Sequence, residues 1–150
     1  MSTYTQILYQ IVFGSKNGLP FLNQQNQDKL FNYIAGIANN KKSIPYKIGG
    51  HLNHLHLIIY LHPSQSLSDF VREIKRSSHN WMVDQNTYFR TFPGWQVGYG
   101  GFSYNYESKK DLIRYVENQA EHHKRINFQD ELIKLLNDYG IVFEEKYLLI

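Results

Sequence analysis

The sequence contains no cysteine, which excludes disulfide frameworks, cysteine-ligated zinc, iron–sulfur centres and thiol nucleophiles. Any metal ion must therefore be bound by histidine, carboxylate, amide or hydroxyl groups. The sequence also has no apolar run of the roughly 20 residues that cross a bilayer, and its first six residues lack the basic and apolar regions of a signal peptide. We therefore expect a soluble, cytoplasmic protein with no membrane partner.

Neither sign of charge dominates, because 16 Lys and Arg residues stand against 13 Asp and Glu residues, for a formal net charge of +3. This balance permits an anionic partner without requiring one. Hydrophobic residues make up 42% of the 150 positions, which is enough for one core, and no repeat, low-complexity tract or linker divides the chain. We predict a single domain spanning residues 1–150.

Hydrophobic periodicity predicts strand, helix, strand, strand, helix and strand, followed by two more helices. The predicted strands are rich in β-branched and aromatic residues and span 5–13, 44–49, 52–61 and 95–103. The predicted helices repeat apolar residues at helical spacing over 30–38, 67–82, 109–123 and 128–136. A turn is expected at Gly49-Gly50 and a small strand at 141–150. This order predicts an α+β fold with a ferredoxin-like or RRM-like antiparallel sheet (βαββαβ) and a C-terminal helical extension.

The third predicted strand contains His54-Leu55-His56. Because side chains alternate across a strand, His54 and His56 project from the same face with Cα atoms roughly 7 Å apart, and two imidazoles there can bind one ion. Two half-buried histidines that are hydrogen-bonded to neighbours would give the same pattern. The motif by itself is therefore a weak indication of a metal site.

Tyr115 and Gln119 are four residues apart on the third predicted helix, so they share one of its faces. The apolar residues of that helix predict that the opposite face packs on the sheet: Leu112, Ile113, Val116 and Ala120. We therefore expect Tyr115 and Gln119 to point outward, where a phenol and an amide can simply be solvated surface. Only their combination with the histidine pair indicates a site.

The chain resembles the single-tyrosine HUH transposases of small insertion sequences, including the repeat-associated tyrosine transposases that bacteria keep as chromosomal genes. The resemblance covers nearly the whole chain and depends on segments in matching order and spacing: Tyr9-Gln10-Ile11-Val12-Phe13, His54-Leu55-His56, the strand from Trp95 to Phe102, Arg114-Tyr115-Val116-Glu117-Asn118-Gln119, and Glu121-His122-His123-Lys124. It implies a DNA transposase, a nuclease and strand transferase that binds hairpin-bearing single-stranded DNA.

By this resemblance, His54 and His56 would be paired metal ligands, Gln119 the third ligand, and Tyr115 the nucleophile that forms a 5′-phosphotyrosine link. The implied cofactor is a divalent ion, Mg²⁺ or Mn²⁺, with Zn²⁺ left open. Members of the family act as dimers, so we expect a homodimer with the tyrosine helix contributed in trans. The implied setting is a bacterial cytoplasm, with the protein associated with the nucleoid when it is on DNA.

Basic residues on the second predicted helix, Arg72, Lys75 and Arg76, follow helical spacing. Such a face is usually only solvated, but beside the implied catalytic set we expect it to bind DNA phosphates. Further basic residues would extend this surface: Lys109, Lys110 and Arg114. His122 and His123, at a predicted helix C-terminus, are expected to meet the helix dipole or phosphate rather than the ion.

Two other functions stay open. The segment Gly98-Tyr99-Gly100-Gly101-Phe102 is similar to the aromatic strand of RNA-recognition modules, whose rings stack on bases, so the chain could be a non-catalytic RRM-like single-stranded nucleic-acid-binding module. Val97 in place of a basic residue and the extra Gly101 weaken that alternative. The chain could also be a domesticated relative that binds hairpin DNA without cleaving it.

Overall fold

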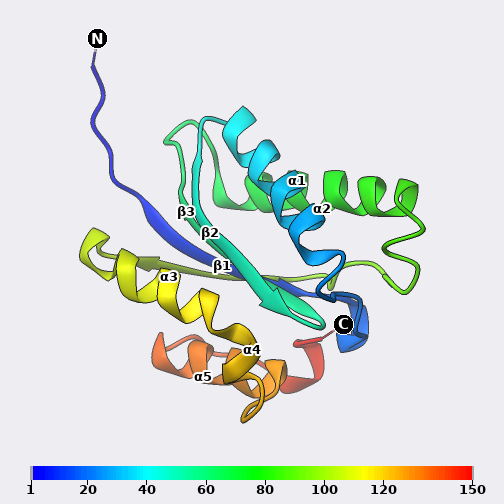
Figure 1. The fold of residues 1–150 in the computed structure, drawn as a ribbon. Coiled ribbons are helices and arrows are strands. Elements are labelled where there is room, and N and C mark those ends of the chain that lie inside the picture. The colour runs from blue at the N-terminus through cyan, green and yellow to red at the C-terminus, as the bar shows by residue number, and fades with distance from the viewer. Residues whose placement is uncertain (1, 150) are drawn as a thin grey trace.

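Four strands form one antiparallel sheet in the computed structural model, which describes residues 2–149. They are β1 (Leu8–Gly14), β2 (Ile44–His51), β3 (His54–Tyr60) and β4 (Gly100–Tyr104), in the order β2-β3-β1-β4 (Figure 1). One helix lies between β1 and β2 in the chain and another between β3 and β4. The α+β, ferredoxin-like βαββαβ fold is therefore confirmed.

Helices cover both faces of the sheet. On one face lie α1 (Gln27–Asn40) and α2 (Leu67–Asp84), and on the other α3 (Lys109–Glu117), α4 (Gln119–His122) and α5 (Phe128–Asp138) (Figure 1). Ser66 caps α2 by accepting a 3.1 Å hydrogen bond from the Asp69 amide, as the capping-box spacing predicts. None of the helices within residues 2–149 combines the length and apolar character needed to span a bilayer.

The two central strands contribute alternate side chains to different cores. Ile11 and Leu57 point toward α1 and α2, into a large apolar cluster. Val12 and Ile58 point toward the C-terminal helices, into two smaller apolar clusters. The buried polar side chains that lie between the sheet and these C-terminal helices are Gln10, His54, His56, Gln119 and Glu131.

The predicted turn at Gly49-Gly50 is wrong, because both glycines lie within β2 and the chain reverses after it. A Cβ on Gly49 would lie 2.6 Å from Cγ1 of Val116 on α3, and a Cβ on Gly50 would lie 2.2 Å from the carbonyl oxygen of His54. The glycines therefore allow a helix and a neighbouring strand to approach closely. The reversal occurs at Leu52, which has a positive φ of 52°.

The strand predicted over 95–103 begins only at Gly100. Trp95 forms an isolated bridge with Ser15, and between the bridge and β4 the carbonyl oxygens of Gln96 and Gly98 accept hydrogen bonds from Lys75 rather than from a strand. The segment keeps one backbone hydrogen bond to β1, from the Gln96 amide to the Gly14 carbonyl oxygen at 2.9 Å, but it forms no continuous strand before Gly100.

The last part of the chain also differs from the prediction. The helix expected over 109–123 divides into α3 and α4 at Asn118, whose φ of −95° and ψ of 18° are not helical. The strand expected at 141–150 is not formed by residues 141–149, which contain the short 3₁₀ helix η3 (Glu145–Tyr147). Ile150 lies outside the described residues.

Candidate active site

His54 and His56 lie on β3 with their rings on the face that the C-terminal helices cover, as strand alternation predicts. Their ring centroids are 5.3 Å apart, and the residues are 1% and 0% exposed. The ring of Phe128, at the start of α5, stacks on His54 with a centroid distance of 4.2 Å. The histidine pair is therefore buried between the sheet and the C-terminal helices.

Tyr115 and Gln119 point inward, so their expected outward orientation is wrong. Gln119 is 1% exposed and Tyr115 is half-buried, whereas Ala120, expected on the packed face, is exposed. The stripe that faces the sheet consists of Leu112, Tyr115, Val116 and Gln119, which follow the i, i+3, i+4, i+7 spacing of a buried helix face. Two of its four members are polar, which the apolar pattern alone did not indicate.

This orientation brings Tyr115 and Gln119 to the histidine pair of the same chain. Oε1 of Gln119 lies 2.9 Å from Nε2 of His54, and the Tyr115 and His56 ring centroids are 5.7 Å apart. The four residues that the sequence analysis singled out as ligands and nucleophile therefore lie in one cluster. No second chain is needed to bring them together.

Two residues that the sequence analysis did not place in the cluster also belong to it. Glu131, on α5, is 2% exposed, and its Oε1 lies 3.0 Å from Nε2 of His56 and 3.4 Å from Nε2 of His54. His123 follows α4, and its Nε2 lies 2.9 Å from Oε1 of Gln119 and 3.3 Å from Oε1 of Glu131. Contrary to the sequence-based expectation, His123 therefore lies in the candidate metal cluster.

The other ring nitrogen of each histidine in the cluster faces a hydrogen-bond acceptor. Nδ1 of His54 lies 3.0 Å from the Asn53 side-chain oxygen, Nδ1 of His56 lies 2.7 Å from the Gln10 side-chain oxygen, and Nδ1 of His123 lies 2.7 Å from the Ile126 carbonyl oxygen. Each Nδ1 therefore carries the proton and donates it. In the neutral imidazoles, Nε2 is left with a lone pair directed into the cluster.

In the cluster, lone pairs on nitrogen and oxygen atoms therefore face one another with no hydrogen atom between them. Nε2 of His54 and Nε2 of His123 each face Oε1 of Gln119 and Oε1 of Glu131, and Nε2 of His56 faces Oε1 of Glu131, at 2.9–3.4 Å. All five atoms are acceptors when the imidazoles are neutral. Donor atoms about 2.1 Å from one ion lie about 3.0 Å apart at octahedral corners and about 3.4 Å apart at tetrahedral ones. His54, His123 and Glu131 offer donor atoms that all lie within 4.8 Å of one another, so the arrangement fits a divalent cation.

The electrostatics of the cluster also favour a bound cation. Burial lowers the pKa of His54 to about 4, so this imidazole is neutral near pH 7. Burial by itself raises the pKa of Glu131, whereas hydrogen bonds donated by His123, His54 and His56, when these imidazoles carry a proton on Nε2, would outweigh burial and hold that pKa well below its usual range. A buried carboxylate that stays ionised needs a positive partner, either a second proton on an imidazole or a metal ion.

Tyr115 lies where the cluster meets open space. Its hydroxyl donates to Oε2 of Glu131 and lies 3.4 Å from Nε2 of His122. Burial and the Glu131 contact raise the pKa of Tyr115 above its ordinary value, so the phenol is protonated in this structure. A pocket of about 380 Å³ is lined by Tyr115, Glu131, His122 and Gln10, and it gives a ligand access to the phenol.

The basic residues of α2 line a separate groove of about 700 Å³. The side chains of Arg72 and Arg76 are 70% and 69% exposed, and each pairs with an acidic residue three positions earlier on the helix. Lys75 instead donates to the carbonyl oxygens of Gln96 (2.8 Å) and Gly98 (2.6 Å), and burial lowers its pKa to about 8. The arginines therefore reach solvent, whereas Lys75 anchors the segment before β4.

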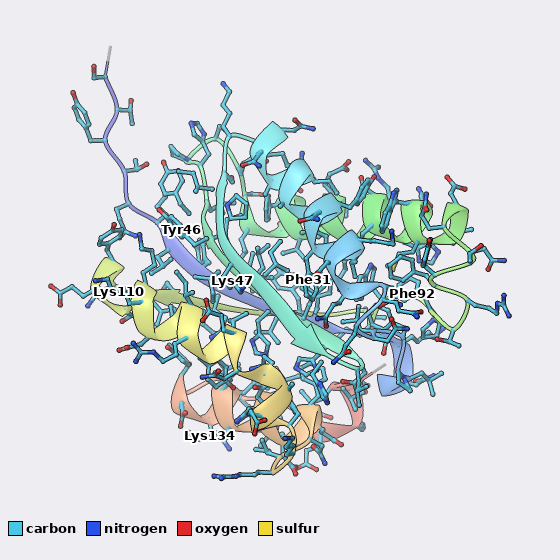
Figure 2. The ribbon with its side chains drawn as sticks, in the orientation of Figure 1. Phe31, Tyr46, Lys47, Phe92, Lys110 and Lys134 are labelled. Atoms are coloured by element: carbon cyan, nitrogen blue, oxygen red, sulfur yellow. The ribbon has the colours of Figure 1, made fainter. Side chains whose placement is uncertain are left out.

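The other basic residues singled out from the sequence lie on α3, which covers the opposite face of the sheet. Nζ of Lys109 lies 4.4 Å from the ring centroids of Tyr46 and Tyr106, and the Arg114 side chain is 72% exposed. Lys110 lies at the exposed start of α3 (Figure 2). The predicted DNA-binding residues therefore occupy two surfaces rather than one continuous surface.

Of the two aromatic residues in the segment similar to an RNA-recognition module, Tyr99 is exposed but Phe102 is not accessible. Phe102 is 2% exposed and packs with Leu132 of α5 and with Tyr139, at a ring-centroid distance of 4.9 Å from the latter. The C-terminal helices cover the sheet face on which bases would stack. The geometry therefore does not favour the RRM-like alternative.

Comparisons with known proteins agree with this fold. Residues 3–119 match the family model described as "Transposase IS200 like". A crystal structure of a proposed transposase from Deinococcus radiodurans is similar with a TM-score of 0.63 and 19% identity, over 79% of this chain and 95% of that chain. A REP-associated tyrosine transposase bound to a REP hairpin is similar with a TM-score of 0.59 and 17% identity, over 84% of this chain and 76% of that chain. A search of curated proteins finds no match.

Proposed function

The chain belongs to the IS200-like transposase family, and from this premise we propose that it binds hairpin-bearing single-stranded DNA, cleaves it through a covalent phosphotyrosine intermediate and rejoins strands. The observation that carries the proposal is the position of Tyr115, whose hydroxyl lies in the same cluster as His54, His56 and Gln119 and borders a pocket. A nucleophile beside a cation site is the arrangement that metal-assisted phosphodiester transfer uses.

In the proposed reaction the Tyr115 oxygen attacks a DNA phosphorus. The new phosphorus–oxygen bond forms a 5′-phosphotyrosine and the bond to the 3′-oxygen breaks. Tyr115 loses its phenolic proton and the departing 3′-oxygen gains one, so that strand ends as a 3′-hydroxyl with no net change in protons. A phenol with an ordinary pKa of about 10 is a better leaving group than an aliphatic alcohol. A 3′-hydroxyl can therefore attack the adduct, restore a phosphodiester and release Tyr115.

His54, His56 and Gln119 are proposed to hold a divalent cation, and the cluster around them supports this assignment. When bound, such an ion stabilises negative charge on the scissile phosphate and on the leaving oxygen. Asn53 and Gln10 orient the histidines by accepting from Nδ1, so the two Nε2 atoms stay directed toward the ligand position. The burial of both imidazoles keeps competing water away from them.

Hairpin DNA is the proposed partner. One structural neighbour is bound to a REP hairpin, and this chain carries exposed basic side chains that can contact phosphates. The proposed DNA contacts are Arg72, Arg76, Lys109, Lys110 and Arg114, whereas the ammonium of Lys75 is held by the Gln96 and Gly98 carbonyl oxygens. Because α2 and α3 cover opposite faces of the sheet, we propose that a hairpin stem and the strand to be cleaved contact different surfaces.

Incubating the protein with labelled hairpin single strands and Mn²⁺, then separating the products on a denaturing gel, tests the function. We expect a covalent protein–DNA adduct that Tyr115→Phe abolishes, while hairpin binding by the variant stays close to that of the wild type. Tyr106→Phe, at an exposed tyrosine at the start of the turn before α3, is the matched control and should form the adduct. Hairpin binding without any adduct would instead indicate a domesticated relative.

A homodimer with the tyrosine helix contributed in trans also belongs to the proposal, although the site is complete in one chain. Mixing the Tyr115→Phe variant with the His56→Ala variant distinguishes a site shared between two chains from a site formed within one chain. Adduct formation in the mixture would show that one chain supplies the tyrosine and the other the histidines. If only wild-type protein forms the adduct, the site works within a single chain.

A further inference from the structure

Helix α5 and the turn before it place two donor groups in the cluster beyond the residues that match the family model, which end at residue 119. We propose that Glu131 and His123 are protein ligands of the divalent cation, and that the second carboxylate oxygen of Glu131 holds the Tyr115 hydroxyl beside it. This inference rests on the proposed function because it describes how the same site is completed. The C-terminal segment would then supply metal ligands as well as cover the site.

The lone pair of His123 is directed into the cluster. Nδ1 of His123 donates to the Ile126 carbonyl oxygen at 2.7 Å, and Nε2 faces Oε1 of Gln119 at 2.9 Å. The amide nitrogen of Gln119 points toward Glu131 at 3.2 Å, so the oxygen that faces His123 carries no hydrogen. A lone pair held 2.9 Å from another lone pair is unfavourable unless a cation lies between them or the imidazole is protonated.

Glu131 brings a buried negative charge into the cluster. Its carboxylate is 2% exposed and is surrounded by the imidazoles of His54, His56, His122 and His123. With neutral imidazoles the cluster has one buried negative charge, which a divalent cation outweighs. A buried carboxylate without a positive partner would cost several kcal/mol, so a role as ligand explains why a carboxylate lies here.

The two carboxylate oxygens of Glu131 face different partners. Oε1 faces Nε2 of His56 at 3.0 Å and Nε2 of His123 at 3.3 Å, on the side where the other donors meet. Oε2 accepts the Tyr115 hydroxyl and the Gln119 amide. One carboxylate therefore connects the cation position to the nucleophile, so Glu131 acts on Tyr115 as a positioning residue.

The donor set also indicates which ions bind best. Mg²⁺ prefers oxygen ligands and retains several waters, whereas imidazole nitrogens favour first-row transition ions. Three imidazoles, one amide oxygen and one carboxylate would therefore favour Mn²⁺, Co²⁺ or Zn²⁺ over Mg²⁺. We expect Mn²⁺ to bind this chain at least about tenfold more tightly than Mg²⁺.

Isothermal titration of the full chain with Mn²⁺ and with Mg²⁺, after removal of bound metal with a chelator, tests the inference. Glu131→Gln keeps the side-chain size and removes the charge, and His123→Gln removes the imidazole. Each should weaken Mn²⁺ binding at least about tenfold. The matched controls are Glu121→Gln, whose carboxylate is exposed on α4 and pairs with Lys124, and His62→Gln, which follows the far end of β3. Both should bind Mn²⁺ like the wild type.

A spectroscopic measurement separates ligand loss from general damage. Bound Co²⁺ absorbs visible light according to its ligand number and type, so Glu131→Gln and His123→Gln should change its spectrum, whereas the two controls should not. If Glu131→Gln does not fold, Glu131→Asp, which withdraws the carboxylate by one methylene, replaces it. A Mn²⁺ affinity and Co²⁺ spectrum equal to the wild type in both the position-131 and the position-123 variants would overturn the inference.

Failure of the inference and failure of the proposed function give different results. If Glu131→Gln and His123→Gln leave Mn²⁺ binding intact but Tyr115→Phe still abolishes the DNA adduct, the function stands and the extra ligands do not. If both substitutions weaken Mn²⁺ binding but no hairpin strand forms an adduct with the wild type, the ligand assignment stands and the function does not.

Discussion

The sheet separates two interiors that are built by the same alternation of side chains but differ in content. Toward α1 and α2, the interior is a large apolar cluster that includes Phe13, Phe70 and Ile74. Toward α3, α4 and α5, smaller apolar clusters accompany His54 and Glu131, which are buried and ionisable. The interior toward α1 and α2 stabilises the fold by burying apolar surface. In the other interior, each buried polar group costs free energy unless it has a hydrogen-bond partner. We infer that stability comes mainly from one face and chemistry from the other.

The largest expected effect on stability is on the apolar face. Phe70 is fully buried on α2, and Phe70→Ala should lower the free energy of unfolding by about 3–5 kcal/mol because it removes packed surface and leaves a cavity. Denaturant unfolding measures this loss. Phe70→Leu, the control, should cost much less because it keeps most of the volume.

The same variant also tests whether the two interiors are independent. Folded Phe70→Ala protein should bind Mn²⁺ with the affinity of the wild type, because Phe70 contributes to the cluster beneath α1 and α2. A large drop in affinity per folded molecule would show that the sheet transmits strain between its faces, and the comparison would then be wrong.

The main elements of the fold were predictable because each depends on its own local pattern. Strands β1 and β3 lie where β-branched residues cluster, and Ser66 caps α2 at the predicted position. The exceptions depend on distant partners. Gly49 allows Val116 of α3 to approach β2, and Lys75 of α2 donates hydrogen bonds to the segment before β4. Such contacts between segments far apart in the sequence leave no local pattern.

The candidate site was predictable in part for a similar reason. The period of a strand places His54 and His56 on one face, and helical spacing relates Tyr115 to Gln119, so these pairs follow from local geometry. Whether the second pair faces inward depends on its partners, and those include Glu131. The orientation could therefore not be derived from apolar residues alone.

Glu131 nevertheless left a signal in the sequence. On α5 it falls within the apolar stripe formed by Phe128, Leu132 and Leu136, all of which are buried. A carboxylate at a core position must find a partner there, because an unpaired buried charge is unstable. A polar residue that interrupts an apolar stripe is thus a useful indicator of a site, and Gln119 on the stripe of Leu112 and Val116 is a second example.

An intermediate effect is expected at Gln10, a polar residue on central strand β1. Its side-chain oxygen accepts from Nδ1 of His56 at 2.7 Å, and its amide nitrogen donates to the Tyr104 hydroxyl at 2.8 Å. Gln10→Leu removes one hydrogen bond from each partner, at Nδ1 of His56 and at the Tyr104 hydroxyl, and should lower the free energy of unfolding by about 1–3 kcal/mol. Because His56 is then free to change tautomer, Mn²⁺ affinity should fall by about 10–100-fold.

Measuring both quantities in Gln10→Leu sharpens the comparison of the two interiors. Phe70→Ala should lose stability without losing Mn²⁺ affinity, whereas Gln10→Leu should lose both in similar measure, because a 10–100-fold weaker affinity corresponds to about 1.4–2.7 kcal/mol. Gln10→Glu, which retains an acceptor for Nδ1 of His56, should recover part of the Mn²⁺ affinity. If Gln10→Leu unfolds more easily but binds Mn²⁺ normally, the hydrogen bond to His56 has only a structural role.

The smallest effects are expected on the surface groove beside α2, where neighbouring basic residues should differ. Lys75→Met keeps an unbranched side chain but removes the ammonium that donates to the Gln96 and Gly98 carbonyl oxygens, so it should cost about 1–2 kcal/mol of unfolding free energy. Arg72→Met, at a side chain 70% exposed, should change stability by no more than about 0.5 kcal/mol. It should instead weaken hairpin binding and reduce the slope of log affinity against log salt by about 1. If the two substitutions change stability and salt dependence equally, Lys75 does not anchor the segment before β4. Both residues would then have the same role on this surface.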